Sequence, residues 1–125
     1  LLERLHNAGA RLFTASNGIG EVMNGRVANA GLSKWLDGKF AADDVGAMKP
    51  SPKYFVTIFK RSGATDLSRT LMVGDNPVTD VNGAVEYGMT GALFGARYEE
   101  PSKATFVAPT MAELERQLFA DEAQA

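Results

Sequence analysis

Short runs of apolar, strand-forming residues alternate along the chain with longer segments whose apolar residues recur every three or four positions. Glycine and proline mark most of the changes between the two patterns. Strands are predicted at residues 11–15, 39–42, 70–73, 90–94 and 106–107. Helices are predicted at residues 1–8, 19–30, 52–62, 77–87 and 111–119. The repeated strand–helix order predicts an α/β fold, a three-layer, Rossmann-like parallel sheet with helices on both faces.

Local features predict how single elements begin and pack. Ser51 and Pro52 fit the N-cap and first position of a helix, and residues 110–113 fit a capping box. Trp35 is interpreted as a core filler in a short turn. The helical residues expected to face the core are Phe55, Ile58, Phe59, Val81, Ala84, Val85, Met111, Leu114 and Leu118.

The length of 125 residues predicts one domain, residues 1–120, followed by a frayed tail at 121–125. A formal net charge of −2 gives no electrostatic reason to expect nucleic acid or an anionic membrane as a partner. The absence of cysteine excludes disulfides, zinc–thiolate sites and cysteine nucleophiles within this sequence. No apolar run approaches the roughly 18 residues of a membrane span, so we expect a cytoplasmic protein.

Two carboxylates follow the third predicted strand. Asp75 comes just after the strand and Asp80 falls in the first turn of the next helix, which Pro77 suits as an opening residue. Ligands of open α/β sheets bind beyond the carboxyl ends of the strands, and a pair of carboxylate oxygen ligands suits Mg²⁺. The alternative is structural, because an Asp in this place is often only an N-cap or a partner of the helix dipole.

A hydroxyl and a cation are predicted at the same edge of the sheet. Ser16 ends the first strand, and Lys49 lies in a loop after the second. Ser16, with the amides of Asn17 and Gly18 at a helix N-terminus, suits phosphate oxygens, and Lys49 suits neutralisation of a transferring phosphoryl group. Structural alternatives remain for each: Ser16 as an N-cap and Lys49 as a solvated lysine. Asp43 and Asp44 are interpreted as surface loop acids.

Four stretches together resemble the haloacid dehalogenase (HAD) superfamily, in its phosphatase and nucleotidase subgroup. FTASNG, DVGAMKPSPKYF and VGDNPVTD are similar to the family's second, third and fourth motifs, and NGAVEYGMTGALF resembles their continuation. The resemblance implies Ser16 and Lys49 as catalytic residues, Asp75 and Asp80 as Mg²⁺ ligands, and a small phosphorylated substrate. It also implies an aspartyl-phosphate intermediate.

The family's first motif, an Asp-x-Asp strand that carries the nucleophile, is absent from this sequence, and so is the helical cap that follows it. We therefore expect the C-terminal part of such an enzyme, with an incomplete core. The alternative is a catalytically inactive binding or interaction module, or one part of a two-chain assembly. Self-association or a partner chain would then complete the sheet. A receiver-type or flavodoxin-type domain explains the strand order but not Ser16 and Lys49 together.

Overall fold

The computed structural model describes residues 1–18, 20, 31–95 and 102–120. The predicted helix at 19–30, most of the polar loop after Phe94 and the tail at 121–125 lie outside these residues. The chain divides into two compact units, Leu1–Thr65 and Asp66–Ala125, and each is described by itself. That the two units form the single domain predicted at 1–120 stays a prediction.

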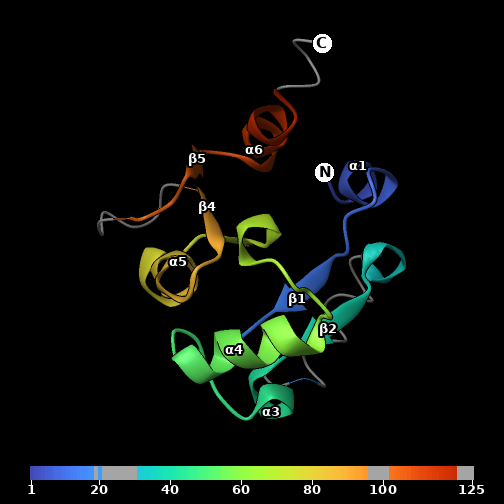
Figure 1. The fold of residues 1–125 in the computed structure, drawn as a ribbon. Coiled ribbons are helices and arrows are strands. Elements are labelled where there is room, and N and C mark those ends of the chain that lie inside the picture. Colours follow the sequence, from blue (N-terminus) through green and yellow to red (C-terminus); the bar gives the residue numbers. More distant parts are fainter. Residues whose placement is uncertain (19, 21–30, 96–101, 121–125) are drawn as a thin grey trace. The chain divides into compact units, whose positions relative to one another are not determined.

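The first unit contains a two-stranded parallel sheet and several short helices (Figure 1). Its elements are α1 (Leu2–Asn7), β1 (Phe13–Ala15), the 3₁₀ helix η1 (Ser33–Trp35), β2 (Gly38–Phe40), α3 (Ala42–Val45) and α4 (Pro52–Arg61). β1 and β2 pair in register, with Phe13 opposite Gly38 and Ala15 opposite Phe40. Phe13 and Phe40 also stack, with ring centroids 5.3 Å apart.

Helix α4 begins and ends as its sequence predicts. Ser51 is the N-cap, Pro52 takes the first helical position, and Gly63 follows the helix with a φ of 80°. Phe55 and Ile58 are buried, whereas Phe59 is only partly covered. In the part of the chain that the structure describes, no helix is long and apolar enough to cross a membrane.

Several local predictions in this unit are wrong. The first strand begins at Phe13 rather than at residue 11. The second strand ends at Phe40, and Asp43 and Asp44 lie in the short helix α3 rather than in a loop, although both are exposed. Acids are favourable in a first helical turn, and the Asp43 carboxylate also accepts a hydrogen bond from the Gly20 amide at 2.8 Å. Trp35 is half-buried rather than a core filler, with Lys34 Nζ 4.9 Å from its ring centroid.

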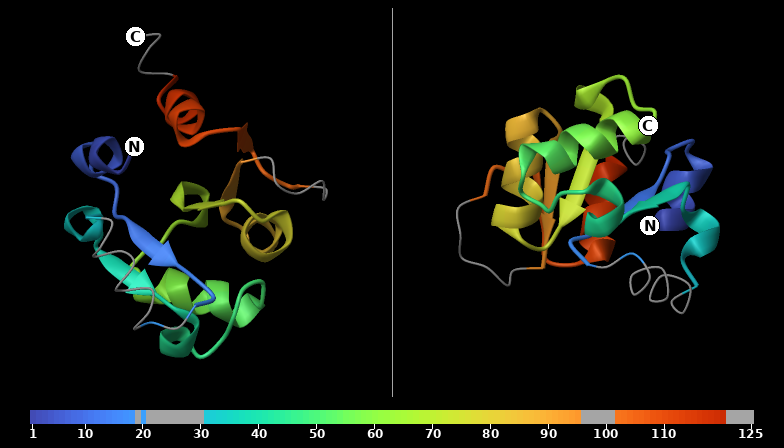
Figure 2. Two further views of the ribbon diagram at one scale, coloured as in Figure 1. Left: turned by 180° about the vertical axis from the view of Figure 1, so that it is seen from behind. Right: turned by 90° about the horizontal axis from the view of Figure 1, so that it is seen from below.

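The second unit contains a three-stranded parallel sheet in the order β3–β4–β5. Figure 2 shows α5 and α6 on opposite faces of this sheet. The elements are the 3₁₀ helix η2 (Leu67–Arg69), β3 (Leu71–Gly74), the π-helix η3 (Pro77–Asn82), α5 (Gly83–Tyr87), β4 (Thr90–Phe94), β5 (Phe106–Ala108) and α6 (Met111–Leu118). The pattern predicted each of the three strands to within one residue at either end.

Close packing holds η3 and α5 against β4. A Cβ atom added at Gly91 would lie 2.8 Å from Val85 Cγ2 and 2.9 Å from Val81 Cγ1, distances that real Cβ atoms essentially never show. Val81 and Ala84 are fully buried, as predicted, and Val85 is partly covered. Glycine at 91 therefore allows the helical segment to approach the strand closely.

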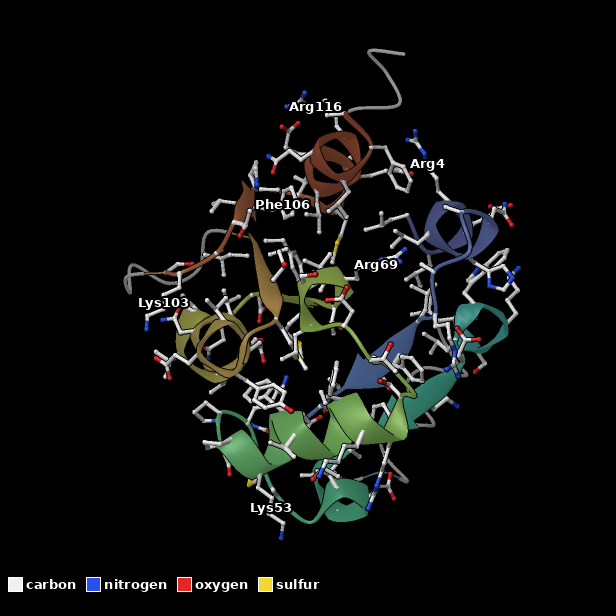
Figure 3. The ribbon with its side chains drawn as sticks, viewed as in Figure 1. Arg4, Lys53, Arg69, Lys103, Phe106 and Arg116 are labelled. Carbon is white, nitrogen blue, oxygen red and sulfur yellow. The ribbon has the colours of Figure 1, made fainter. Side chains whose placement is uncertain are left out.

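One of the two hydrogen bonds of the predicted capping box is present at the start of α6. The Thr110 hydroxyl accepts a hydrogen bond from the Glu113 amide at 3.2 Å. The Glu113 carboxylate binds Arg116, which lies on the side of α6 away from the sheet (Figure 3). Leu114 is fully buried and Leu118 partly covered, but Met111 is 41% exposed and does not face inward as predicted.

Candidate functional site

Ser16 takes up the position directly after β1. Its backbone amide donates to the carbonyl of Phe40 at 2.9 Å, which extends the pairing of β1 with β2 by one residue. Its hydroxyl oxygen accepts a hydrogen bond from the Gly18 amide at 2.9 Å, so the chain turns there. A hydroxyl group that accepts in this way still carries its own hydrogen for donation.

The side chain of Asn17 pairs with the backbone of Lys49. Asn17 Nδ2 donates to the Lys49 carbonyl at 3.0 Å, and Asn17 Oδ1 accepts from the Lys49 amide at 2.6 Å. These residues lie 32 positions apart, so the pair joins the turn after β1 to the loop between α3 and α4. Both backbone groups of Lys49 thus form hydrogen bonds with a side chain, although Lys49 lies outside any strand.

The ammonium group of Lys49 reaches the end of β1. Lys49 Nζ donates to the carbonyl of Ala15 at 2.8 Å. Ala15, Ser16 and Asn17 are consecutive, so a hydroxyl group and a cation lie at one turn. The structure thus brings together Ser16, Asn17, Gly18 and Lys49, the four residues predicted to hold phosphate, although their function stays a prediction.

Tyr54 is a residue of this site that sequence reasoning missed. It is fully buried in α4, and its hydroxyl group lies 2.9 Å from the Phe40 carbonyl and 3.3 Å from the Ser16 carbonyl. A buried tyrosine needs a partner for its hydroxyl group. Its place beside Phe55 in the apolar stripe of a helix was the available signal. Tyr54 fixes α4 against the ends of both strands.

In the second unit, Asp75 directly follows β3 and is half-buried. The N-cap of the following helix is Asn76, whose Oδ1 accepts from the amides of Val78 at 3.0 Å and Thr79 at 3.2 Å. The structural alternative for Asp75, that it serves only as an N-cap, therefore does not apply. Asp75 thus lies just beyond the carboxyl end of β3, the edge of an open α/β sheet at which ligands bind.

Asp80 is buried, with 8% of its surface exposed. Its carboxylate lies 3.4 Å from the Asn76 amide through Oδ2 and 3.4 Å from the Thr79 hydroxyl through Oδ1. A Cβ atom at Gly74 would overlap the Asp80 side chain, so only glycine leaves room for this carboxylate at the end of β3. The two acids thus flank the same strand end.

Asp75 and Asp80 alone would make an incomplete ligand set for a cation. Among the described residues, no group of three or more His, Cys, Asp and Glu side chains could hold a metal ion. Mg²⁺ usually keeps several waters and binds through one or two carboxylates, so Asp75 and Asp80 fit that ion as a partial ligand set. Ser16 and Lys49 belong to the first unit and Asp75 and Asp80 to the second.

Comparison with known proteins decides the family. The haloacid dehalogenase-like hydrolases match residues 1–88, which include Ser16, Lys49, Asp75 and Asp80. The chain belongs to this family. Its fold is the α/β, Rossmann-like core of the haloacid dehalogenase-like hydrolases, as the sequence predicted.

Relatives of this chain include nucleotidases and phosphatases. It is 30% identical to pyrimidine 5'-nucleotidase YjjG of Escherichia coli over 101 residues, 81% of this chain and 44% of that protein. A HAD phosphatase of Thermococcus onnurineus superposes with a TM-score of 0.83 at 30% identity, over 94% of this chain and 54% of that one. The HAD-hydrolase YfnB of Bacillus subtilis, solved bound to magnesium, gives a TM-score of 0.83 at 23% identity, over 94% and 51%. The chain thus spans about half the length of these proteins.

Proposed function

We propose that this chain supplies the phosphate-holding and metal-holding residues of a Mg²⁺-dependent phosphomonoester hydrolase. The observation that carries the proposal is the group formed by Ser16, Asn17 and Lys49 at the end of β1. The nucleotidase and phosphatase relatives support a small phosphorylated substrate.

The first unit would bind the phosphoryl group. The Ser16 hydroxyl group and the Asn17 amide would donate to phosphoryl oxygens, and Lys49 would offset their negative charge. The Gly18 amide, which donates to Ser16 Oγ, orients that hydroxyl group. Lys49 is anchored at Ala15, the residue before Ser16, so its charge is held at the same turn as the hydroxyl group. Preorganised donors of this kind need little rearrangement when charge develops.

The second unit would hold the metal ion through Asp75 and Asp80. Bound Mg²⁺ would polarise a phosphoryl oxygen and offset its charge. Two neighbouring residues would help to fix these carboxylates at the end of β3. Asn76 caps η3, and Gly74 leaves the space that Asp80 fills. The magnesium in the YfnB structure supports this assignment.

The nucleophile is expected from residues outside this sequence. Hydrolysis through an aspartyl-phosphate needs an Asp that attacks phosphorus and a second group that protonates the leaving oxygen. The sequence contains no Asp-x-Asp pair. The groups proposed here bind and orient the phosphoryl group, so the chain alone would bind its ligands without turning them over.

A second candidate is a non-catalytic binding or interaction module, or one part of a two-chain assembly. Within the described residues, β1 pairs only with β2, and β3 pairs only with β4. Both strands that carry site residues thus present an edge to which another strand could bind. A partner chain or a second copy could provide a strand that pairs with such an edge.

Calorimetric titration of the chain with inorganic phosphate, with and without Mg²⁺, tests the main proposal. We expect Ser16→Ala and Lys49→Met to weaken phosphate binding about tenfold each, since a hydrogen bond to a charged group contributes about 1.5–3 kcal/mol. Lys53→Met is the matched control, because Lys53 is an exposed lysine only four residues from Lys49. Equal phosphate affinity of wild type and both site variants would contradict the proposal.

A further inference from the structure

Lys49 is held at three points by two residues. Its backbone amide and carbonyl both bind the Asn17 side chain, and its Nζ binds the Ala15 carbonyl. Ala15 and Asn17 are the two neighbours of Ser16 in the sequence. Two residues that fix Lys49 therefore flank the hydroxyl group with which it is proposed to act.

The loop around Lys49 needs this support. Lys49 lies between the end of α3 at Val45 and the start of α4 at Pro52, outside any strand. A lysine has a flexible four-carbon stem, so its ammonium group is placed accurately only where both its backbone and its tip are fixed. The Asn17 side chain supplies the backbone part of that restraint through two hydrogen bonds.

We propose that the Asn17 side chain is a positioning residue for Lys49, which sets where the Lys49 ammonium group lies beside Ser16. The inference rests on the proposed function for its effect on phosphate, but the restraint itself is a property of the chain alone. Asn17 Oδ1 and Nδ2 are both directed at the Lys49 backbone. The side chain therefore acts on the anion through Lys49, whereas the Asn17 backbone amide is the group proposed to bind it.

NMR relaxation of the Lys49 Cε group in the full chain tests the restraint directly. We expect an order parameter well above that of the exposed Lys53 in wild type, and a fall toward the Lys53 value in Asn17→Ala. An unchanged order parameter in Asn17→Ala would overturn the proposal. Should that variant fail to fold, Asn17→Ser, whose shorter side chain cannot reach both backbone groups, is expected to give the same fall.

A matched control removes a similar contact at the other end of the same sheet. The Asp37 carboxylate accepts from the Leu12 amide at 2.7 Å, and the Asp37 amide donates to the Leu12 carbonyl at 2.7 Å. Asp37→Ala thus removes a side-chain-to-backbone bond before β1 and β2 begin. We expect it to leave the Lys49 order parameter unchanged and the phosphate affinity within twofold of wild type.

A double-mutant cycle on phosphate affinity separates positioning from direct contact. We expect Asn17→Ala to weaken phosphate binding about tenfold when Lys49 is present, and to have no further effect in Lys49→Met. An equal loss in both backgrounds would show that the Asn17 side chain acts on the anion itself and would overturn the proposal. A wild-type chain that binds no phosphate would contradict the proposed function instead, while the relaxation measurement still decides the role of Asn17.

Discussion

Asp80 lies so close to Gly74 that a Cβ atom at position 74 would be 2.4 Å from both Cβ and Oδ2 of Asp80. The carboxylate therefore occupies space that a side chain on the last residue of β3 would otherwise take. Both residues are buried. The glycine in the Val73-Gly74-Asp75 stretch thus has a packing function in addition to ending the strand, and it places one acid of the predicted pair.

Gly74→Ala is expected to destabilise the protein, because either β3 or Asp80 must move. Overpacking of a buried site typically costs about 1–3 kcal/mol, and we expect a decrease of that size in the free energy of unfolding, measured by urea denaturation. A decrease in Gly74→Ala well below about 1 kcal/mol would contradict the packing argument.

Asp75→Asn is expected to weaken Mg²⁺ binding more than Asp80→Asn does. Asp75 lies at the strand tip, whereas the Asp80 carboxylate already accepts hydrogen bonds from Asn76 and Thr79. Calorimetry with Mg²⁺ measures the difference, and Asp66→Asn serves as a control because Asp66 is an exposed acid before β3. Equal Mg²⁺ affinities of wild type, Asp75→Asn and Asp80→Asn would exclude both acids as ligands.

Glu113 is expected to titrate well below a typical glutamate. Hydrogen bonds from Arg116 and Gln117 lower the pKa of Glu113 from 4.5 to about 2. Because the folded pKa is the lower one, the stabilisation is present above about pH 4.5 and is lost as pH falls toward 2. The pKa of Glu113, measured by NMR titration of its Cδ signal, should return toward 4.5 in Arg116→Ala. A Glu113 pKa that is the same in wild type and Arg116→Ala would contradict the ion pair.

The isolated chain is expected not to hydrolyse para-nitrophenyl phosphate, because it contains no Asp-x-Asp pair. General acid–base catalysis alone is typically worth about 10²–10⁴ in rate, and the bond-forming carboxylate is lost as well.

Light scattering at several concentrations should show a dimer or larger species, because the edges of β1 and β3 can bind another strand. A stable monomer with Mg²⁺-dependent activity that Asp43→Asn or Asp44→Asn removes would overturn this prediction.

The sequence pattern predicted β3, β4 and β5 to within one residue at either end, but it began the first strand at residue 11 rather than at Phe13. The unbroken apolar run in β3 and the Ser-Pro pair at the start of α4 are the strongest of these local signals. The pattern failed at Asp43 and Asp44, where a single helical turn is too short to show helical spacing. It also placed Met111 inside, since helical spacing identifies a face but not the extent of the surface that covers it.

The site could be predicted only in part, for a related reason. Ser16, Lys49, Asp75 and Asp80 were found because each follows or lies near the end of a predicted strand. The two hydrogen bonds between the Asn17 side chain and the Lys49 backbone could not be predicted, because they join two loops 32 residues apart. The role of Tyr54 likewise depends on the distance between α4 and the ends of β1 and β2.

The most direct test of the central claim is a map of where phosphate binds. A ¹⁵N and side-chain NMR titration of the full chain with inorganic phosphate would follow the Asn17 and Gly18 amides and the Lys49 ammonium group together. The account predicts that these groups shift with one common affinity, and that Lys49→Met weakens the affinity read from the two amides about tenfold. A binding site elsewhere, with the signals of Asn17, Gly18 and Lys49 unchanged at saturation, would contradict it.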